Sequence, residues 1–527
     1  MIRNPLIIAT RGSDLALWQA NYVKNIIENL GHPCELKIVK TKGDLMSELG
    51  PYKMEGKGYF TKEIEDALLN EEADIAVHSF KDLPTESVPG LIIGAVSERE
   101  DPSELLLIHK AAVDSKQKFS LRKGAKVGTS SARRKSQLLA YRNDLVLEDI
   151  RGNVPTRLKK LREGQFDAIL IASAGVERLE LDTSDFHVEK IIPTDIIPAP
   201  AQGILAIQVR EKDKDLITLL RKTDDAESRS ASGIERSVLN LFHGGCHTPV
   251  GVYASYDDDK EVFQVRASWS ESWDKLPVSV YSESKESASL PERVIKKIRS
   301  ARPTSVFVTR FGRKNSYLRN VLEGNGFTLE ERALIEIVPV PLKSFPNVEW
   351  VFFASKHAVK NFFAQNPQIG TVKYACVGRV TSDELRLFGK RADFVGSSTD
   401  TRMIGKQFAS MAGNAKVLFP QAKGSMRSIQ QQFVKPENVI DLIVYETLKK
   451  NEGEMPEAEI IVFTSPSNVE AWFETYSFPK NKKAIAMGDA TAHALKNFRV
   501  YAESMPDTFD DAGLARAVFG ASAGKNY

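Results

Sequence analysis

The stretch Ala125-Lys-Val-Gly-Thr-Ser-Ser-Ala-Arg-Arg134 passes from a short apolar run into a helical pattern. A second stretch, Leu145-Val-Leu-Glu-Asp-Ile-Arg-Gly-Asn-Val-Pro-Thr-Arg157, does the same. A strand that leads directly into a helix is the repeating unit of α/β folds, and its turn places backbone N–H groups where anions are bound. The two stretches therefore predict an α/β fold with an anion site at the turns.

Four arginines stand at these two turns: Arg133, Arg134, Arg151 and Arg157. Each guanidinium can grip a carboxylate or phosphate with two donors, and a charge-assisted hydrogen bond contributes roughly 1.5–3 kcal/mol. An arginine at a helix N-terminus is unfavourable because its charge opposes the helix dipole. A bound anion would compensate for this and would explain why arginines occupy these positions. We expect a polyanionic ligand; the alternative is that these are ordinary surface arginines.

The composition excludes several classes of protein. The 527 residues are 42% hydrophobic and 27% charged, which suits several well-packed domains, and the net charge of +3 gives no support for a nucleic-acid partner. The N-terminal residues lead directly into a predicted strand, Leu6–Thr10, without a signal peptide or membrane span, so we expect a cytoplasmic protein with no membrane partner. Cys34, Cys246 and Cys376 are too far apart for a disulfide framework or a cysteine-rich zinc site, and no metal is expected.

Strands and amphipathic helices alternate from the N-terminus, which predicts mainly parallel sheets covered by helices. A helix is expected over 14–30 with Ser13 as its N-cap, followed by a polar stretch over 42–58 that suits a mobile lid. The proline-rich passage 192–201 is typical of a hinge or a crossover between two lobes. After residue 224 the pattern changes, and we expect a smaller α+β domain that ends near residue 300.

The last third of the chain contains an internal repeat. Residues 351–363 align with 461–473, and residues 374–381 align with 484–491, both at an offset of 110 residues. Two matched segments at one offset predict two similar α/β lobes with a ligand between them. Generic similarity among strand–turn–helix units is the alternative explanation.

Two further motifs bring chemistry to the first part of the chain. Lys81 and Asp82 follow a buried type of strand at the end where open α/β folds bind ligands, although a surface ion pair is the alternative there. His78, on the strand itself, is expected to be a structural histidine. Gly244-Gly-Cys-His-Thr-Pro249 is a glycine-framed turn that presents Cys246, whereas Cys34 and Cys376 lie in apolar runs and fit inert buried thiols.

With these motifs in place, residues 3–300 closely resemble the porphobilinogen deaminase (hydroxymethylbilane synthase) family. Further stretches of the resemblance are Thr10-Arg-Gly-Ser-Asp-Leu-Ala-Leu-Trp-Gln19, Gly56-Lys-Gly-Tyr-Phe-Thr-Lys-Glu63 and Pro198-Ala-Pro-Ala-Gln-Gly203. The family carries a dipyrromethane cofactor on the cysteine of the Gly-Gly-Cys turn, which matches Cys246. One mild departure is that His247 and Thr248 stand where the family more usually has glutamine or serine and then valine.

The resemblance also implies roles for other residues. Asp82 matches the catalytic aspartate, which faces the cationic pyrrole nitrogen that forms when porphobilinogen loses ammonia. The implied cofactor-binding residues are Lys81, Asp82, Thr129, Ser131, Arg133, Arg134, Arg151 and Gly152. The implied substrate-binding residues are Arg11, Ser13, Arg157 and Arg178. Each pyrrole carries an acetate and a propionate, so the growing chain is a polyanion of the kind that the arginines predict.

Residues 303–527 resemble the uroporphyrinogen-III synthase family, whose members have two α/β lobes. The resemblance rests on the repeat, on Phe463-Thr-Ser-Pro-Ser467, on Gly488-Asp-Ala-Thr-Ala492 and on Val444-Tyr-Glu-Thr447. It implies that Tyr445 helps the substrate hydroxyl to leave and that Thr381, Ser467 and Thr491 bind substrate. Lys356 stands where the second copy of the repeat has Pro466, which puts the substrate contacts on that side in doubt.

Together the two resemblances imply a bifunctional enzyme that converts porphobilinogen to hydroxymethylbilane and then to uroporphyrinogen III. The implied fold is a three-domain deaminase, with two periplasmic-binding-protein-like α/β lobes and a small α+β domain, followed by a two-lobed α/β synthase. The expected domains are 1–101 with 202–222, 102–201, 223–300, 303–340 with 453–527, and 341–452, in a monomer. The alternatives are a deaminase with a non-catalytic C-terminal scaffold, or a non-catalytic anion-binding protein.

Overall fold

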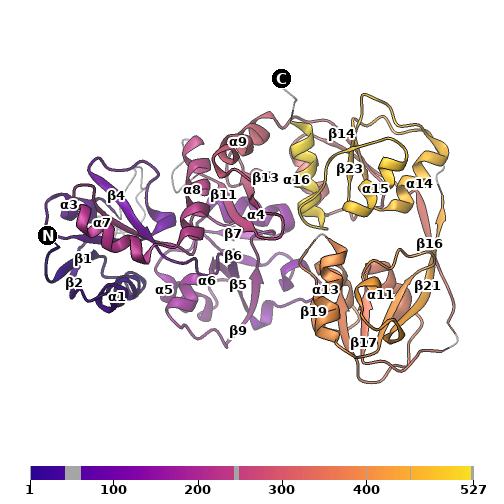
Figure 1. Cartoon of the computed structure of the whole chain (residues 1–527), viewed down its shortest axis with the longest axis horizontal. Coiled ribbons are helices and arrows are strands. Elements are labelled where there is room, and N and C mark those ends of the chain that lie inside the picture. The colour runs from indigo at the N-terminus through magenta and orange to yellow at the C-terminus, as the bar shows by residue number, and fades with distance from the viewer. Residues whose placement is uncertain are drawn as a thin grey trace. The chain divides into compact units, whose positions relative to one another are not determined.

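The computed structural model (Figure 1) describes residues 2–41, 61–242, 248–342, 344–398, 400–450 and 453–523. The chain divides into two compact units, residues 1–300 and 301–527. The predicted lid at 42–58 and the turn that bears Cys246 lie outside the described residues. Within the described ranges, no helix combines the length and the apolar character needed to cross a bilayer.

The first unit contains two five-stranded sheets, each with helices packed around it. The first sheet has the order β2–β1–β3–β10–β4, with strands Cys34–Ile38, Leu6–Thr10, Ile75–Ser79, Leu205–Arg210 and Leu91–Val96. Its helices are α1 (Asp14–Asn29), α3 (Lys62–Leu69) and α7 (Lys214–Leu220). The strand expected at Leu6–Thr10 is therefore confirmed, and the helix expected over 14–30 ends one residue earlier.

The second sheet has the order β7–β6–β8–β5–β9. Its strands are Val146–Glu148, Lys126–Gly128, Ala168–Ala172, Glu104–His109 and Phe186–Ile191, and its helices are α4 (Ala132–Tyr141), α5 (Val154–Arg162) and α6 (Ser173–Arg178). Alternate side chains of β8 enter different cores: Ala168 and Leu170 lie in one, Ile169 and Ile171 in the other. This alternation shows that helices bury both faces of the strand, as a predominantly apolar strand requires.

Each sheet also contains a strand that runs against its neighbours, which the expectation of mainly parallel sheets did not specify. β10 is antiparallel to β3 and β4, and β5 is antiparallel to β8 and β9. The chain reaches both strands by crossing from the other lobe, through residues 97–103 to β5 and residues 192–204 to β10. Because no covering helix precedes these strands within their own sheet, the handed βαβ connection that gives parallel neighbours does not apply to them.

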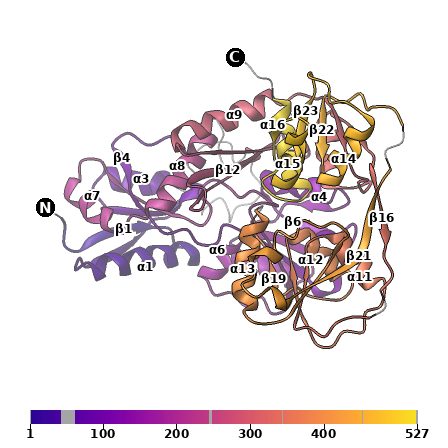
Figure 2. The same ribbon diagram turned by 45° about the vertical axis from the view of Figure 1, so that its right-hand side comes forward.

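The rest of the first unit is the small α+β part expected after residue 224. An antiparallel sheet of β11 (Val250–Asp257), β12 (Val262–Trp269) and β13 (Val278–Ser284) lies beside helices α8 (Ala226–Leu241) and α9 (Leu290–Ser300), as Figures 1 and 2 both show. Helix α8 ends at Leu241, five residues before Cys246 in the sequence.

The second unit has two lobes, each built on a sheet. One sheet has the order β15–β14–β22–β23–β24, with strands Thr328–Glu331, Ser305–Val308, Ile460–Phe463, Lys483–Ala486 and Ala502–Ser504. The other has the order β16–β21–β20–β17–β18–β19, with strands Ile335–Pro339, Val439–Lys449, Val417–Ala422, Trp350–Phe353, Lys373–Cys376 and Phe394–Val395. The antiparallel pair β16 and β21 runs between the two lobes (Figure 1).

The structure confirms the internal repeat and extends it. Helices α11 (Lys356–Phe363) and α12 (Arg379–Arg386) of one lobe correspond to α14 (Pro466–Thr475) and α15 (Asp489–Asn497) of the other. Beyond the segments that align in sequence, α13 (Thr401–Ala412) corresponds to α16 (Asp511–Ser522) at the same offset, and Asp400 and Asp510 cap these two helices. Helix α10 (Tyr317–Gly324) lies outside this repeat.

His78 of β3 is a buried structural histidine, as expected. Its Nε2 lies 3.1 Å from Oε1 of Gln208 on the neighbouring strand β10. Burial lowers the pKa of His78 to about 4, although the hydrogen bond to Gln208 opposes the shift. The neutral imidazole is therefore the form that the folded core accepts.

This burial predicts a pH-dependent stability. Above pH 6.5, His78 is neutral in both the folded and the unfolded state. Between pH 6.5 and about 4, the unfolded chain binds a proton at His78 that the folded core does not accept, so the stability of the fold decreases as the pH is lowered. The loss attributable to His78 should approach about 3 kcal/mol at pH 4. Denaturant titrations at pH 7 and pH 4 measure how much unfolding free energy each variant loses between the two pH values. This loss should be smaller in His78→Gln than in the parent by this amount. In the exposed-site control His109→Gln it should equal the loss in the parent. Equal losses in the parent and His78→Gln would contradict the assignment.

Candidate functional site

The two predicted anion turns form one continuous edge of the second sheet. β6 and β7 are parallel neighbours, so the turns that follow them lie side by side. Ser130 joins the turns, because its Oγ donates to the carbonyl oxygen of Ile150 (2.8 Å) and accepts from the N–H of Ile150 (3.1 Å). The two arginine-bearing stretches that the sequence separates are thus held together before any ligand binds.

Local capping shapes each turn. Ser131 is the N-cap of α4, and its Oγ accepts from the N–H of Arg134 (3.4 Å). Asn153 caps α5 and accepts from the N–H of Thr156 (3.0 Å). Thr129 is buried, and its N–H donates to the carbonyl of Glu148 (2.8 Å). Gly152 has a φ of +111°, and a Cβ there would lie 2.6 Å from Thr156 Cγ2, so the second turn needs glycine.

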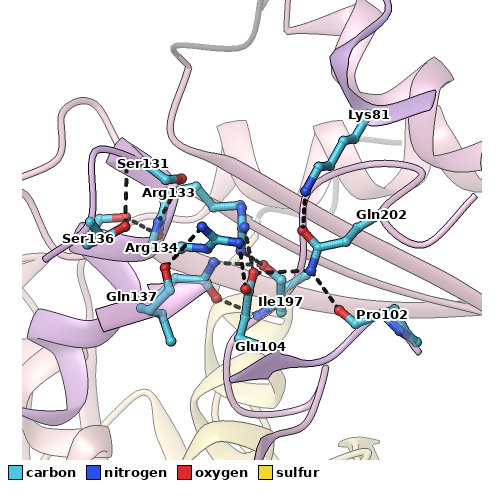
Figure 3. A network of polar contacts seen from close by, with 12 residues as sticks. Lys81, Pro102, Glu104, Ser131, Arg133, Arg134, Ser136, Gln137, Ile197 and Gln202 are labelled. Carbon is cyan, nitrogen blue, oxygen red and sulfur yellow. Dashed lines mark hydrogen bonds and ion pairs between the residues drawn. The ribbon is translucent and has the colours of Figure 1, made fainter. Parts of the chain in front are cut away.

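Arg133 and Arg134 converge on one buried carboxylate (Figure 3). Glu104, at the start of β5, is fully buried; its Oε1 lies 2.7 Å from Arg133 Nη2, and its Oε2 lies 2.7 Å from Arg134 Nη2. Arg133 Nη1 also donates to the carbonyl of Ile197 (2.8 Å), and Arg134 Nη1 donates to the carbonyl of Leu170 (3.2 Å). Both guanidiniums are therefore fixed in place by the protein itself.

The charge of Glu104 persists in this environment. Burial is the largest influence and opposes ionisation, but the two guanidiniums together outweigh it, and the pKa of Glu104 falls to about 2. A carboxylate at neutral pH between two arginines leaves one net positive charge on the three groups. The cluster thus keeps an excess of positive charge for an anionic ligand.

Lys81 and Asp82 approach this cluster from the first lobe. Both belong to a short 3-10 turn (Phe80–Asp82) that directly follows β3, and the Asp82 side chain is exposed. Lys81 Nζ donates to Oε1 of Gln202 (3.4 Å). Burial lowers the pKa of Lys81, and the charges of Arg134 and Arg133 add to the effect while Asp82 opposes it. The strand end that the sequence singled out therefore faces the arginines.

The second turn contributes Arg151, Gly152 and Arg157. Arg151 is exposed, while Arg157 is half-buried and donates from Nε to the carbonyl of Gly152 (2.8 Å). The pKa of Arg157 is lowered first by burial and then by the charge of Arg134, and Asp82 opposes this shift. Arg157, Arg134 and Asp82 thus lie within electrostatic reach of one another.

Arg11 and Ser13 lie between β1 and α1, and Arg178 lies on α6, which packs against α1. Arg11 follows β1, and Ser13 is the N-cap of α1 as expected, although its hydroxyl makes no capping hydrogen bond. Arg178, at the end of α6, is buried, donates from Nη2 to the carbonyl of Gly203 (2.7 Å) and stands over the ring of Trp18 on α1. The burial of Arg178 lowers the pKa of its guanidinium.

Two buried donors at this site have no acceptor among the described residues: Nε of Arg134 and Nε of Arg178. An orphaned buried donor is costly, and a ligand carboxylate would satisfy it. The acid side chains of a dipyrromethane fit the donor on Arg134. The other two thiols do not compete as attachment points, because Cys34 and Cys376 are free and buried, and burial raises the pKa of Cys34 to about 11 and that of Cys376 to about 12.

Sequence reasoning missed two members of the cluster, Glu104 and Gln202. Glu104 opens an otherwise apolar run, Glu104-Leu-Leu-Leu-Ile108, and a charge at the head of a buried strand is the signal that was available. Gln202 lies within the stretch 198–203 that the resemblance used, but nothing in the sequence tells which groups its amide contacts.

In the second unit, Tyr445 of β21 lies beside the loop that leads into α11. Its Oη is 3.2 Å from Oγ of Ser355, the N-cap of α11, and its ring is 6.2 Å from that of His357. Burial raises the pKa of Tyr445, and the bond to Ser355 opposes the shift only in part. The phenol therefore keeps its proton at neutral pH. Burial also lowers the pKa of His357 to about 4, with Lys356 and Lys360 adding to the effect.

The other predicted synthase residues lie on three different helices. Thr381 and Thr491 occupy the first turns of α12 and α15 at equivalent places in the repeat, and both are buried, while Ser467 lies in the first turn of α14. An ion pair from Arg379 of α12 to Asp510, the N-cap of α16 (2.9 Å), joins the two lobes near these positions. Among the described residues, Tyr445 makes no hydrogen bond or ring contact with Thr381, Ser467 or Thr491.

Comparisons with known proteins agree with this division. Residues 6–218 match the family model described as porphobilinogen deaminase, dipyromethane cofactor binding domain, and residues 231–268 match that of the porphobilinogen deaminase C-terminal domain. Residues 316–516 match the model of uroporphyrinogen-III synthase HemD.

Two curated relatives and one solved structure are similar to portions of the chain. The porphobilinogen deaminase of Sulfurimonas denitrificans is 46% identical over 48% of this chain and 80% of its own length. That of Nitratidesulfovibrio vulgaris strain DP4 is 48% identical over 48% of this chain and 80% of its own length. The crystal structure of uroporphyrinogen-III synthetase from Helicobacter pylori aligns with 40% of this chain and 96% of its own, at 18% identity and a TM-score of 0.31.

The length and identity of the deaminase matches establish the family of the first unit, and the synthase model covers most of the second. The chain belongs to the porphobilinogen deaminase family, and in it a deaminase is joined on one polypeptide to a uroporphyrinogen-III synthase.

Proposed function

We propose that residues 1–300 join four molecules of porphobilinogen into hydroxymethylbilane, with release of one ammonia at each addition and uptake of one water when the product is released. We propose further that residues 301–527 close this product to uroporphyrinogen III with inversion of the last pyrrole and loss of that water. The observation that carries the first half is the anchored set of Arg133, Arg134 and Lys81 beside Asp82. This set offers fixed positive charge for the carboxylates of a pyrrole and one exposed carboxylate for the cation that forms when ammonia leaves.

We assign the cofactor to Cys246, with Lys81, Thr129, Ser131, Arg133, Arg134, Arg151 and Gly152 around its acid side chains. When bound, the dipyrromethane supplies the free α-carbon at which the pyrrole chain grows. Arg11, Ser13, Arg157 and Arg178 bind the incoming substrate in this assignment. Arg133 uses two of its nitrogens on Glu104 and Ile197, so its part is to hold the cluster in place and to lend it charge.

Asp82 acts on the substrate. Loss of ammonia from porphobilinogen leaves an electrophile with a cationic pyrrole nitrogen, and a carboxylate close to that nitrogen stabilises the developing charge. Asp82 lies in the turn after β3, next to Lys81, and its charge acts on Lys81 and Arg157. Its exposed side chain leaves it accessible to substrate in the described part of the unit.

In the second unit we assign to Tyr445 the departure of the substrate hydroxyl. Its protonated phenol, oriented by Ser355, can donate to the leaving oxygen. Thr381, Ser467 and Thr491 bind the substrate from the helix starts of the two lobes. We also propose that the protein acts as a monomer in the cytoplasm.

The cofactor assignment predicts a mass increment. The purified protein should be heavier than its sequence by a dipyrromethane, and peptide mapping should place the increment on Cys246. Replacement of Cys246 by Ala should abolish turnover, whereas Cys34→Ala and Cys376→Ala should retain it because both thiols are buried and carry a raised pKa. An unmodified Cys246 in active protein would refute the assignment. An unmodified Cys246 in folded protein that consumes no porphobilinogen would favour the alternative of a non-catalytic anion-binding protein.

The role of Asp82 predicts a large kinetic effect with little structural change. Asp82→Asn removes the charge but nearly preserves the shape, so porphobilinogen consumption should fall by roughly 10²-fold or more while the mass increment on Cys246 remains. Asp82→Glu, which restores the charge at a displaced position, should recover part of the rate. Near-normal turnover of Asp82→Asn would move the catalytic role to another group.

The role of Tyr445 predicts a change in product rather than in substrate consumption. Hydroxymethylbilane released to water closes without inversion to the type I isomer, so a slower synthase yields more type I product. Tyr445→Phe should raise the type I share, as measured by chromatography after oxidation to porphyrins, and Tyr476→Phe is the control because Tyr476 Oη bonds backbone carbonyls elsewhere in the unit. An unchanged isomer ratio in Tyr445→Phe would remove Tyr445 from the reaction.

A further inference from the structure

Gln202 occupies the place where the two lobes of the deaminase unit approach each other. It lies in the crossing segment between β9 and β10, and its side chain is 1% exposed. Its Nε2 donates to the carbonyl of Pro102 in the other crossing segment (2.8 Å) and to Glu104 Oε1 (3.2 Å), while its Oε1 accepts from Lys81 Nζ (3.4 Å). Figure 3 shows these contacts together with the arginine pair.

The neighbours of this amide allow one orientation only. A carbonyl oxygen and an ionised carboxylate can only accept hydrogen bonds, so the NH₂ group must face Pro102 and Glu104. The oxygen then faces the ammonium of Lys81, which can only donate. A flipped amide would set oxygen against carboxylate and NH₂ against ammonium. Glutamine is thus selected here over glutamate, which has no N–H to donate, and over apolar residues, which would leave Lys81 without this acceptor.

The other end of the network fixes the arginines. Glu104 receives Arg133 on one oxygen and Arg134 on the other, and its Oε1 also accepts from Gln202. A continuous series of polar contacts therefore leads from Lys81 in the first lobe, through Gln202 and Glu104, to the arginine pair in the second lobe. Asp82 follows Lys81 in the same 3-10 turn, so whatever fixes the backbone of Lys81 also places Asp82.

We propose that Gln202 and Glu104 are positioning residues of the deaminase reaction: they set the placement of the Lys81–Asp82 turn of one lobe against the arginine pair of the other. This inference rests on the proposed function of the same site. A misplacement of about 1 Å can cost roughly 10²-fold in rate when reacting groups must be aligned, so the effect of losing the contact falls on turnover.

The first test replaces Gln202 by Leu. The variant should keep the mass increment on Cys246 and should lose at least tenfold in kcat for porphobilinogen, with a smaller change in KM. The matched control is Gln208→Leu, which removes another buried amide that contacts His78 and Glu65 in the first lobe. A similar loss of thermal stability with kcat within twofold of the parent is expected for the control. A folded Gln202→Leu with kcat within twofold of the parent would overturn the proposal.

A double-mutant cycle with Lys81→Met separates positioning from general damage. If Gln202 acts through Lys81, Gln202→Leu should cost less than threefold in the Lys81→Met background, whereas equal costs in both backgrounds would overturn the proposal. If Gln202→Leu fails to fold, the near-isosteric Gln202→Glu replaces it and is held to the same limits. Failure of the proposed function itself would show differently, as a parent protein that consumes no porphobilinogen.

Discussion

The buried carboxylate of Glu104 is the constraint on which the deaminase site depends. Arg133, Arg134 and Lys81 come together from two lobes. Without a counter-ion, the free energy needed to remove these cations from water would exceed the stabilisation from their other hydrogen bonds. Glu104 offsets part of that cost, and the arginines in turn keep it ionised, with a pKa of about 2. The site therefore holds its positive charge in a fixed geometry before a ligand arrives, which is the condition for strong electrostatic stabilisation.

The sequence allowed the local structure of this site to be predicted, because its signals are local. The β6–α4 and β7–α5 turns, the N-cap at Ser131 and the strand before Lys81 each lie within a few residues of the pattern that indicates them. The way these local elements come together into one site could not be predicted, because it depends on contacts between residues far apart in the sequence. Gln202 contacts Glu104 across 98 residues and Lys81 across 121, and the strands β5 and β10 turn antiparallel only because the chain crosses between lobes.

In the synthase unit, too, local sequence patterns could be predicted and the contacts between distant residues could not. The repeat was visible as two short aligned segments, and the structure extends it to α13 and α16, whose sequences share little beyond their aspartate caps. The two copies differ where function is expected. Lys356 replaces Pro466 at the first helical position, and Ser355 contacts Tyr445, which lies on β21 outside the repeated segments. A shared fold thus carries an asymmetric set of side chains.

The central claim is that one chain carries out two successive reactions. The most direct measurement supplies the intact protein with porphobilinogen alone and determines the isomer composition of the product by chromatography after oxidation to porphyrins. The account predicts mainly the type III isomer, because hydroxymethylbilane made by residues 1–300 is closed with inversion by residues 301–527. Consumption of porphobilinogen with only the type I isomer as product would contradict it and would leave the second unit as a non-catalytic scaffold.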